Sequence, residues 1–186
     1  ELDWLGLGPC NALSWAPDGK ANVLGRHTGD PARWKRYRGG TAGHLWVDAR
    51  GNGTYRRILD QLKGNFASPM WVDKRIYFIS DHQGIGNIYS CRPDGADVRR
   101  HTDHGEYYAR FASADGRSIV YQHAADIWAL DVASDRARRV DFDFPSPRTQ
   151  RNRKFVNPAQ YLGGFSVHPK GHSLAVETRG KLFSFP

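Results

Sequence analysis

The chain carries the sequence WAPDG at residues 15–19, and this short turn decides the fold because variants of it recur. Each copy starts with an apolar or aromatic residue, and the later copies are ASADG at 112–116, VHPKG at 167–171 and a degenerate WVDK at 71–74. The copies begin at positions 15, 71, 112 and 167, which are 56, 41 and 55 residues apart. Strand-rich repeats of about 40 to 50 residues are typical of four-stranded propeller blades.

A second repeated feature, a pair of apolar and aromatic residues, follows the same rhythm. Successive pairs are 43, 39 and 55 residues apart, and they are Leu45-Trp46, Ile88-Tyr89, Ile127-Trp128 and Leu182-Phe183. Together the two registers predict an all-β fold of four-stranded antiparallel blades, with three blades and the start of a fourth. Each blade buries its apolar faces against its neighbours. We therefore expect an incomplete β-propeller cut from a longer protein.

The rhythm also predicts the domain organisation. Blades are expected over residues 12–59, 68–102 and 107–140, with Asp-Gly turns joining β-rich runs as in hairpins and no helix. Residues 141–162 break the rhythm with a turn-rich and basic segment. The predicted domains are the last three blades of a first propeller (1–144), a linker (145–162) and the first strands of a second propeller (163–186).

Composition indicates an ordinary globular protein. The chain has 186 residues, 39% of them hydrophobic, and no apolar run approaches the ~20 residues of a membrane helix. Cys10 and Cys91 are the only cysteines and show no metal-binding spacing, so we expect two reduced, buried or unreactive thiols and a cytoplasmic location. A signal preceding Glu1 stays open. Core or cross-strand packing is expected for the tryptophans at repeat positions, which are Trp15, Trp46, Trp71 and Trp128.

The net charge of +8 is concentrated in two segments. Residues 26–38 hold five Lys or Arg and one acidic residue, and residues 145–158 hold four Lys or Arg and none. Because strands in a blade alternate in direction, the long loop 27–43 should share one end of the propeller with the connections between blades. That basic, histidine-rich end could attract a peptide carboxylate or an acidic partner, or be a solvated surface. Regularly placed stacking aromatics are missing, which disfavours nucleic acid.

Motifs for catalysis and metal binding are missing from the sequence. It has no Gly-x-Ser-x-Gly elbow, no His-Glu-x-x-His and no context for a cysteine nucleophile. His101, Asp103 and His104 have ligand chemistry, but no fourth ligand has a matching spacing. A capped turn between blades is the expectation there, with no metal and no cofactor.

Several segments resemble the propeller region of tricorn proteases in their actinobacterial form. They are GRHTGDPARWKRYRGGTAG at 25–43, NFASPMW at 65–71, IYFISDH at 76–82, NIYS at 87–90 and FVNPAQYL at 155–162. The resemblance covers essentially the whole chain. It implies a large, self-assembling cytosolic serine peptidase that degrades peptides released by the proteasome. It also implies a six-bladed propeller followed by a seven-bladed one, with both acting as channels and filters for oligopeptides.

The resemblance implies no catalytic residue in this chain, because the catalytic Ser and His of the family lie in later domains. From charge and loop position, the candidates for substrate binding are Arg33, Arg36 and Arg38. Expected partners are oligopeptides and further copies of the protein, with no nucleic acid and no membrane. Two alternatives stay open: a TolB-like scaffold that binds proteins and has no enzymatic activity, and the gating propeller of a prolyl-oligopeptidase-type enzyme.

Overall fold

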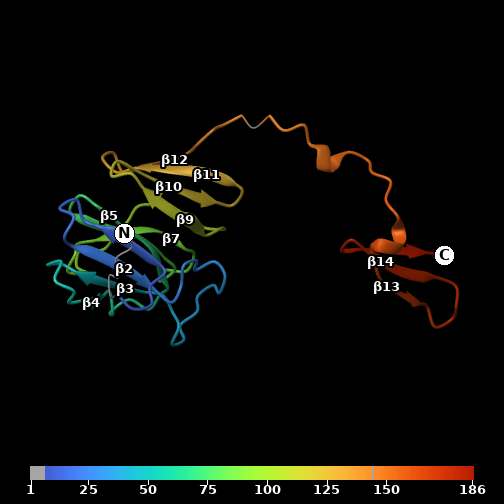
Figure 1. Cartoon of the computed structure of the whole chain (residues 1–186), viewed down its shortest axis with the longest axis horizontal. Coiled ribbons are helices and arrows are strands. Elements are labelled where there is room, and N and C mark those ends of the chain that lie inside the picture. The colour runs from blue at the N-terminus through green and yellow to red at the C-terminus, as the bar shows by residue number, and fades with distance from the viewer. Residues whose placement is uncertain (1–6, 144) are drawn as a thin grey trace, which may run out of the picture. The chain divides into compact units, whose positions relative to one another are not determined.

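A computed structural model describes residues 7–143 and 145–186, so residues 1–6 and 144 of the predicted first domain lie outside the described residues. The described chain is all-β, with four antiparallel sheets and two short 3-10 helices (Figure 1). It forms two compact units, of which one ends at Phe142 and the other runs from Asp143 to Pro186. Each unit is described by itself below.

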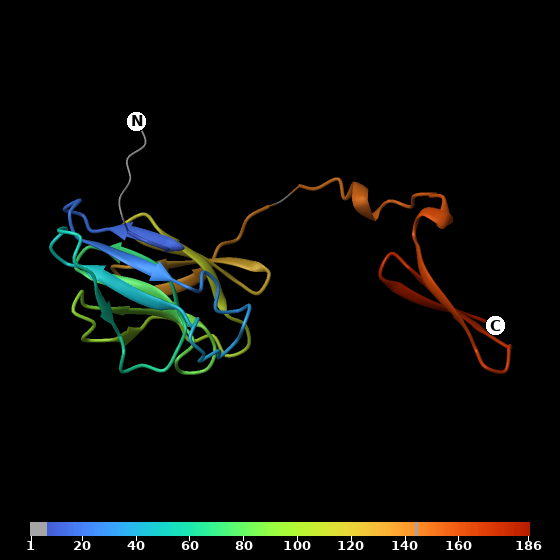
Figure 2. The same cartoon turned by 60° about the horizontal axis from the view of Figure 1, so that its bottom comes forward.

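The first unit consists of three four-stranded blades, in each of which consecutive strands pair in sequence order (Figure 2). Blade 1 contains β1 (Ala12–Trp15), β2 (Asn22–Arg26), β3 (His44–Asp48) and β4 (Arg56–Ile58). Blade 2 contains β5 (Phe66–Val72), β6 (Arg75–Ser80), β7 (Asn87–Cys91) and β8 (Arg99–Arg100). Blade 3 contains β9 (Ala109–Ala114), β10 (Ser118–His123), β11 (Asp126–Asp131) and β12 (Arg136–Arg139). The predicted fold class is therefore confirmed.

The repeated Asp-Gly turn joins the first two strands of blades 1 and 3. Oδ1 of Asp18 accepts the backbone N–H groups of Lys20 and Ala21 at 2.8 and 3.1 Å. Gly19 follows with a φ of +68°, a left-handed conformation that glycine adopts without steric cost. The aspartate thus satisfies the turn backbone and the glycine reverses the chain, which is why this sequence marks blades 1 and 3.

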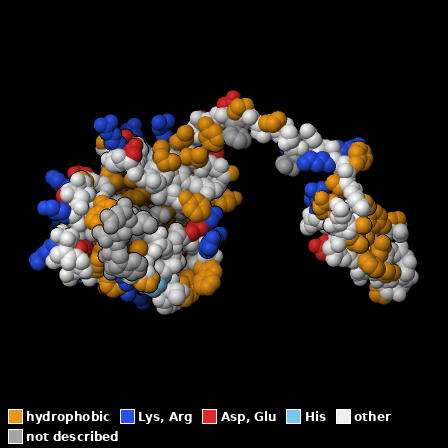
Figure 3. All heavy atoms as spheres, viewed as in Figure 1, with side chains coloured by type: hydrophobic (Ala, Val, Ile, Leu, Met, Phe, Trp, Pro, Cys, Tyr) orange, Lys and Arg blue, Asp and Glu red, His pale blue; other side chains and the backbone are white. Residues whose placement is uncertain are grey.

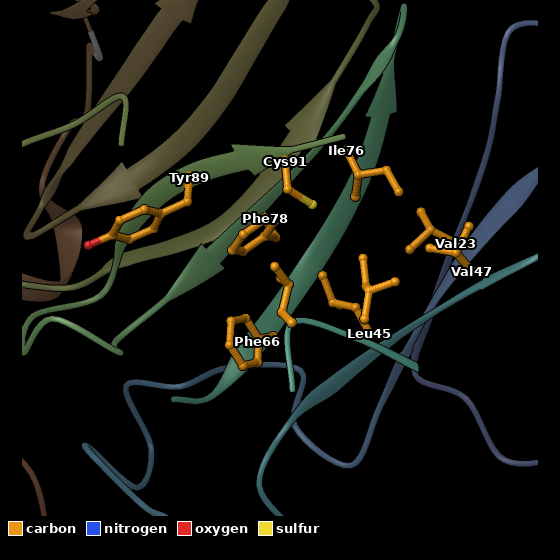
Figure 4. Close-up of a cluster of buried hydrophobic side chains, with 10 residues drawn as sticks. Val23, Leu45, Val47, Phe66, Ile76, Phe78, Tyr89 and Cys91 are labelled. Carbon is orange, nitrogen blue, oxygen red and sulfur yellow. The ribbon is translucent and has the colours of Figure 1, made fainter. Parts of the chain in front are cut away.

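The apolar core lies between the blades, because alternate residues of a strand face opposite neighbours. In β6, Ile76 and Phe78 pack towards blade 1, and Tyr77 and Ile79 pack towards blade 3. Figure 4 shows the first of these clusters, in which side chains of blade 1 face those of blade 2. Phe78 is fully buried, and burying such a side chain stabilises the fold by about 1.5–3 kcal/mol.

Blade 3 is covered on one side only. Ile119 and Tyr121 of β10 are buried against blade 2, whereas Val120 between them is 44% exposed. On β11, Ile127 is 40% exposed as well. The three blades therefore do not close into a ring, in agreement with the predicted incomplete propeller.

The tryptophans at repeat positions differ in their surroundings. Trp71 packs on the cluster between blades 1 and 2, and Trp128 on the cluster between blades 2 and 3. Trp46 is half-buried beneath the guanidinium of Arg26, 5.1 Å from the ring centroid. Trp15 is 45% exposed and so lies outside the core, while its position opposite Asn22 of β2 agrees with the other predicted alternative, cross-strand packing. It is the last residue of β1, where the chain enters a surface turn.

Both cysteines are free thiols. Cys91 is buried in the core between blades 1 and 2, and burial raises the pKa of its thiol to about 12. It is therefore unreactive, as predicted. Cys10 is exposed, so of the two predicted alternatives, burial does not apply to it and its reactivity stays a prediction.

The second unit is a three-stranded antiparallel sheet preceded by two short 3-10 helices. Its elements are η1 (Thr149–Arg151), η2 (Pro158–Gln160), β13 (Leu162–Val167), β14 (Leu174–Thr178) and β15 (Lys181–Phe185). The helices were not predicted; the side chain of Asn157 accepts the backbone N–H of Ala159 and begins η2. Hydrophobic side chains gather over this sheet (Figure 3), where Phe165 is 69% exposed and Leu182 74%. Among the described residues, none of the helices has the length and apolarity that crossing a bilayer requires.

Candidate functional site

The long loop between β2 and β3, residues 27–43, carries most of the excess positive charge of the first unit, and we call it the basic loop. It is folded upon itself by local hydrogen bonds. Oδ1 of Asp30 accepts the N–H of Ala32 at 3.1 Å, and the carbonyl of Trp34 accepts the N–H of Tyr37 at 3.1 Å. The loop therefore has a defined course although it contains no regular element.

Asp81, at the end of β6, fixes the basic loop to blade 2. Its fully buried carboxylate accepts the backbone N–H of Arg36 at 2.9 Å and the guanidinium of Arg38 at 3.0 Å. The same carboxylate accepts the backbone N–H of Asn65, at 2.9 Å, from the connection between blades 1 and 2. One buried charge thus joins three segments that are distant in the sequence, and charge-assisted hydrogen bonds of this kind are the stronger ones.

Asn65 completes this connection. Its Oδ1 accepts the N–H of Gly43 at 3.1 Å, and its Nδ2 donates to the carbonyl of Tyr37 at 3.0 Å. Gly43 lies so close to blade 2 that a Cβ there would clash with the carbonyl oxygen of Phe66. The connections between blades and the basic loop therefore meet at one end of the unit, as the strand alternation predicts.

An ion pair ties the other side of the basic loop to blade 3. Nε of Arg110, on β9, donates to Oδ2 of Asp30 at 3.1 Å, and the Asp30 side chain is only 8% exposed. β9 is the first strand of blade 3 and pairs with β10. The loop is consequently held from two blades at once.

Between the basic loop and β9 lies an open cavity of about 590 Å³. It is lined by His27, Thr28, Gly29, Asp30, Arg33, Trp34, Thr41 and Phe111. Two large aromatic side chains are exposed there: Trp34 is 68% exposed and Phe111 58%. The cavity thus combines aromatic walls with a guanidinium, and the carboxylate in its lining is already paired with Arg110.

The three candidate arginines have different surroundings. Arg33 lines the cavity, and among the described residues no carboxylate lies within ion-pair distance of it. Arg36 has a left-handed backbone, φ +57°, and its N–H is bound to Asp81. Arg38 donates to that buried carboxylate, so its charge is compensated within the fold. Of the three, Arg33 is the residue best placed to meet an anion in the cavity; substrate binding by any of them stays a prediction.

The structure pairs a serine, a histidine and an aspartate that no sequence motif indicates. Oγ of Ser90 lies 2.7 Å from Nε2 of His101, whose Nδ1 lies 2.5 Å from Oδ1 of Asp135. The connectivity is that of a hydrolase triad. However, Ser90 is fully buried in β7, and its hydroxyl also accepts Nε–H of Arg75 at 2.8 Å. A substrate carbonyl cannot reach this oxygen, so the chain of contacts links blades 2 and 3 and is not a nucleophile site.

The three residues considered as metal ligands in the sequence, His101, Asp103 and His104, each contact a different partner. Asp103 is paired with Arg100 at 2.6 Å, and Nε2 of His104 lies 3.0 Å from the hydroxyl of Tyr121. His101 takes part in the contacts with Ser90 and Asp135. Across residues 7–143 and 145–186, no group of three His, Cys, Asp or Glu side chains could hold a metal ion.

His104 instead belongs to an aromatic cluster. Its ring stacks on that of His123 with a centroid separation of 3.7 Å, and the edge of Trp128 meets both rings. Burial, followed by the nearby His123, lowers the pKa of His104 to about 4. The imidazole is therefore neutral at physiological pH and acts as a packing element between blades 2 and 3.

Sequence reasoning located the basic loop but missed the residues that hold it. In the sequence, Asp81 appeared only within the segment 76–82, and Arg110 and Phe111 were not singled out. Asp81 lies 43 residues after its partner Arg38, and Arg110 lies 80 residues after its partner Asp30. No spacing rule within one chain segment would have revealed them.

Comparison with known proteins gives a consistent result. Residues 3–136 match the family model described as the tricorn protease N-terminal β-propeller domain. A putative tricorn protease homolog 2 of Streptomyces coelicolor is 42% identical over 189 residues, covering 94% of this chain and 16% of that protein. The tricorn protease of Thermoplasma acidophilum is 35% identical over 96% of this chain and 16% of its own length. The chain thus spans about a sixth of the length of these curated relatives.

Solved structures agree with this family match. The crystal structure of a tricorn protease superposes with a TM-score of 0.76 and 34% identity, over 97% of this chain and 17% of the other. A putative TolB from Agrobacterium tumefaciens gives a TM-score of 0.55 at 18% identity, over 72% of this chain and 50% of the other. At that identity the TolB likeness bears on the fold alone.

Proposed function

The chain belongs to the tricorn protease family, and from this premise we propose that it is a non-catalytic β-propeller segment of a serine peptidase that degrades oligopeptides. In this proposal the peptidase is a cytoplasmic homo-oligomer acting after the proteasome, and the propeller is a channel and filter for its substrates. Residues 1–144 supply the last three blades of a first propeller, 145–162 a linker and 163–186 the first strands of a second. The family match and the small share of the relatives' length that the chain covers support this assignment.

The observation that carries the proposal is the basic loop, held against two blades with Arg33 beside an open cavity. A positive charge at the mouth of a cleft raises the local concentration of anionic ligands. A guanidinium also matches the geometry of a carboxylate. The free C-terminus of an oligopeptide carries such a carboxylate, so the loop suits the retention of peptides. The TolB-like scaffold is the weaker reading, since only the fold supports it.

The proposal is tested first on the native protein. An antibody against this segment should detect, in the source cells, a polypeptide far longer than 186 residues, and the captured material should hydrolyse oligopeptides. A native polypeptide of 186 residues, or a longer one without peptidase activity, would contradict the proposal.

Charge reversal tests the role of the basic loop in the same peptidase. We expect the double variant Arg33→Glu with Arg36→Glu to lower kcat/KM for peptides with a free C-terminal carboxylate more than for their C-terminal amides. Arg117→Glu is the matched control, because this exposed arginine lies in the turn between β9 and β10, away from the basic loop. Equal effects on carboxylate and amide peptides would show that the loop arginines are solvated surface.

A further inference from the structure

The cavity beside the basic loop has two exposed aromatic walls that carboxylate capture does not use. We propose that Trp34 and Phe111 form a subsite for a large apolar side chain, above all an aromatic one, at the C-terminal end of a bound peptide. The inference rests on the proposed function in that it takes the ligand to be a peptide. It adds a preference for the side chain that the peptide presents.

Phe111 reaches the cavity because β9 is irregular at this residue. The pairing of β9 with β10 shifts between Val120 and Gln122, so a β-bulge falls at Phe111. The φ of Phe111 is +53°, a conformation that a bulky residue rarely adopts. Bulges re-aim side chains and are frequent next to functional sites. The backbone is therefore distorted at the place where it turns a large aromatic side chain out into the cavity.

Blade 2 shows what this bulge looks like without the aromatic residue. The pairing of β5 with β6 shifts between Ala67 and Met70, and Ser68 there has a φ of +50°. The residue pairs between the first two strands of blade 2 match those of blade 3 with one constant difference in residue number. In this alignment, Ser68 of blade 2 occupies the same position as Phe111 of blade 3. A serine thus suffices to build the bulge. The phenylalanine of blade 3 is an addition that the fold does not require.

Trp34 forms the facing part of the subsite from the basic loop. Its ring meets that of Tyr37 edge-on with a centroid separation of 5.3 Å, which orients the indole without covering it. The ion pair between Asp30 and Arg110 joins the basic loop to β9. Asp30 lies four residues before Trp34, and Arg110 lies one residue before Phe111. The ion pair therefore brings both aromatic residues to one cavity. Arg110 also lies over the Phe111 ring, 4.6 Å from its centroid.

The charges of the lining indicate which kind of ligand fits. The Asp30 carboxylate is occupied by Arg110, and Arg33 leaves the cavity with a positive charge beside its aromatic walls. A peptide C-terminus that ends in an aromatic residue offers a carboxylate and a ring together. Aromatic rings in contact stabilise each other by edge-on or offset stacking in addition to apolar burial. A single-stranded nucleic acid would offer similar chemistry, but the sequence lacks the regularly placed stacking aromatics that such binding uses.

The test measures binding of labelled peptides to the full chain by fluorescence anisotropy. The probes are two hexapeptides that are identical except for a C-terminal Phe or Ala, and the amide of the Phe peptide. We expect the Phe peptide to bind about tenfold more tightly than the Ala peptide, since the added ring is buried against two aromatic residues. Trp34→Ala and Phe111→Ser should each remove most of this difference. Trp15→Ala, which alters an exposed tryptophan outside the cavity, should keep it.

Each outcome decides the matter. Equal affinity for the two peptides, no binding of either, or a preference that survives both variants would overturn the inference. Displacement of the Phe peptide by a short single-stranded oligonucleotide at lower concentration than by unlabelled peptide would also overturn it. Phe111→Ser introduces the residue that blade 2 carries at the same place, so this variant is expected to fold, and circular dichroism checks it. If the preference is absent while the native protein hydrolyses peptides, the subsite fails and the proposed function stands.

Discussion

Replacing Asp81 with asparagine should be among the most destabilising single changes in the first unit. The buried carboxylate accepts two backbone N–H groups at 2.9 Å and the Arg38 guanidinium at 3.0 Å. An asparagine keeps one acceptor oxygen, turns an NH2 group towards a donor and leaves Arg38 without its counter-charge. Breaking a buried ion pair costs about 3–5 kcal/mol. Because Arg38 is 37% exposed and regains water, we expect about 3 kcal/mol, a large part of the ~5–15 kcal/mol that stabilises a domain.

Urea unfolding followed by tryptophan fluorescence measures this loss, and a double-mutant cycle with Arg38→Met isolates the ion pair. Hydrogen exchange should also speed up across residues 36–43, because these are the residues that the carboxylate anchors. Asp97→Asn is the matched control: this aspartate is paired with two arginines but is exposed, and its loss should be small. If Asp81→Asn is no more destabilising than Asp97→Asn, the basic loop is not held by Asp81 in the way described.

Four further outcomes are expected. Burial lowers the pKa of His104 to about 4, so as the pH falls the unfolded chain binds this proton before the folded chain does. The contribution of the neutral His104 to the free energy of unfolding should therefore be fully present above about pH 6.5 and be lost as the pH drops towards 4. Thermal denaturation should show a smaller fall in stability for His104→Gln over this pH range. A thiol reagent should add one label to the native chain, at Cys10, and two in denaturant when Cys91 opens, as intact mass will show. We expect the uncovered side of blade 3 to promote self-association of the chain, and Val120→Lys should reduce it in sedimentation analysis because it places a charge there; unchanged association would show that this side is not the contact. Ser90→Ala should leave the activity of the proposed peptidase intact, and a loss of turnover in folded protein would show that the buried hydroxyl takes part in catalysis.

The repeat alone predicted most of the first unit. Leu45-Trp46, Ile88-Tyr89 and Ile127-Trp128 fall in β3, β7 and β11, which are the third strands of their blades. This success has a physical cause. Successive residues of a strand face the two neighbouring blades alternately, and Asp-Gly turns join consecutive strands, so both patterns can be seen within a short stretch of sequence. The exposure of Trp15 was not predicted because burial at a strand end depends on the turn that follows.

The candidate site was only partly predictable. The position of the basic loop follows from strand alternation, but the compensation of Arg38 by Asp81 depends on a contact across 43 residues. The bulge that exposes Phe111 leaves no mark in the sequence, since Phe111 stands in an ordinary strand-forming run. Charge counts therefore located the basic loop. The structure was needed to distinguish Arg33, which lines the cavity, from Arg38, which is paired with Asp81 and stabilises the fold.

The division of β6 between two neighbours has a consequence for how the chain is made on the ribosome. Tyr77 and Ile79 are buried by side chains such as Ile119 and Leu130 of the following blade. Those partners emerge about 40 to 53 residues later, which at roughly 5–20 residues per second leaves one apolar side of blade 2 uncovered for about 2–11 seconds. Every new blade thus covers its predecessor and exposes a fresh side of its own. The nascent chain therefore exposes apolar surface throughout propeller synthesis. This surface lies on the most recently formed blade, and it is where a chaperone would bind.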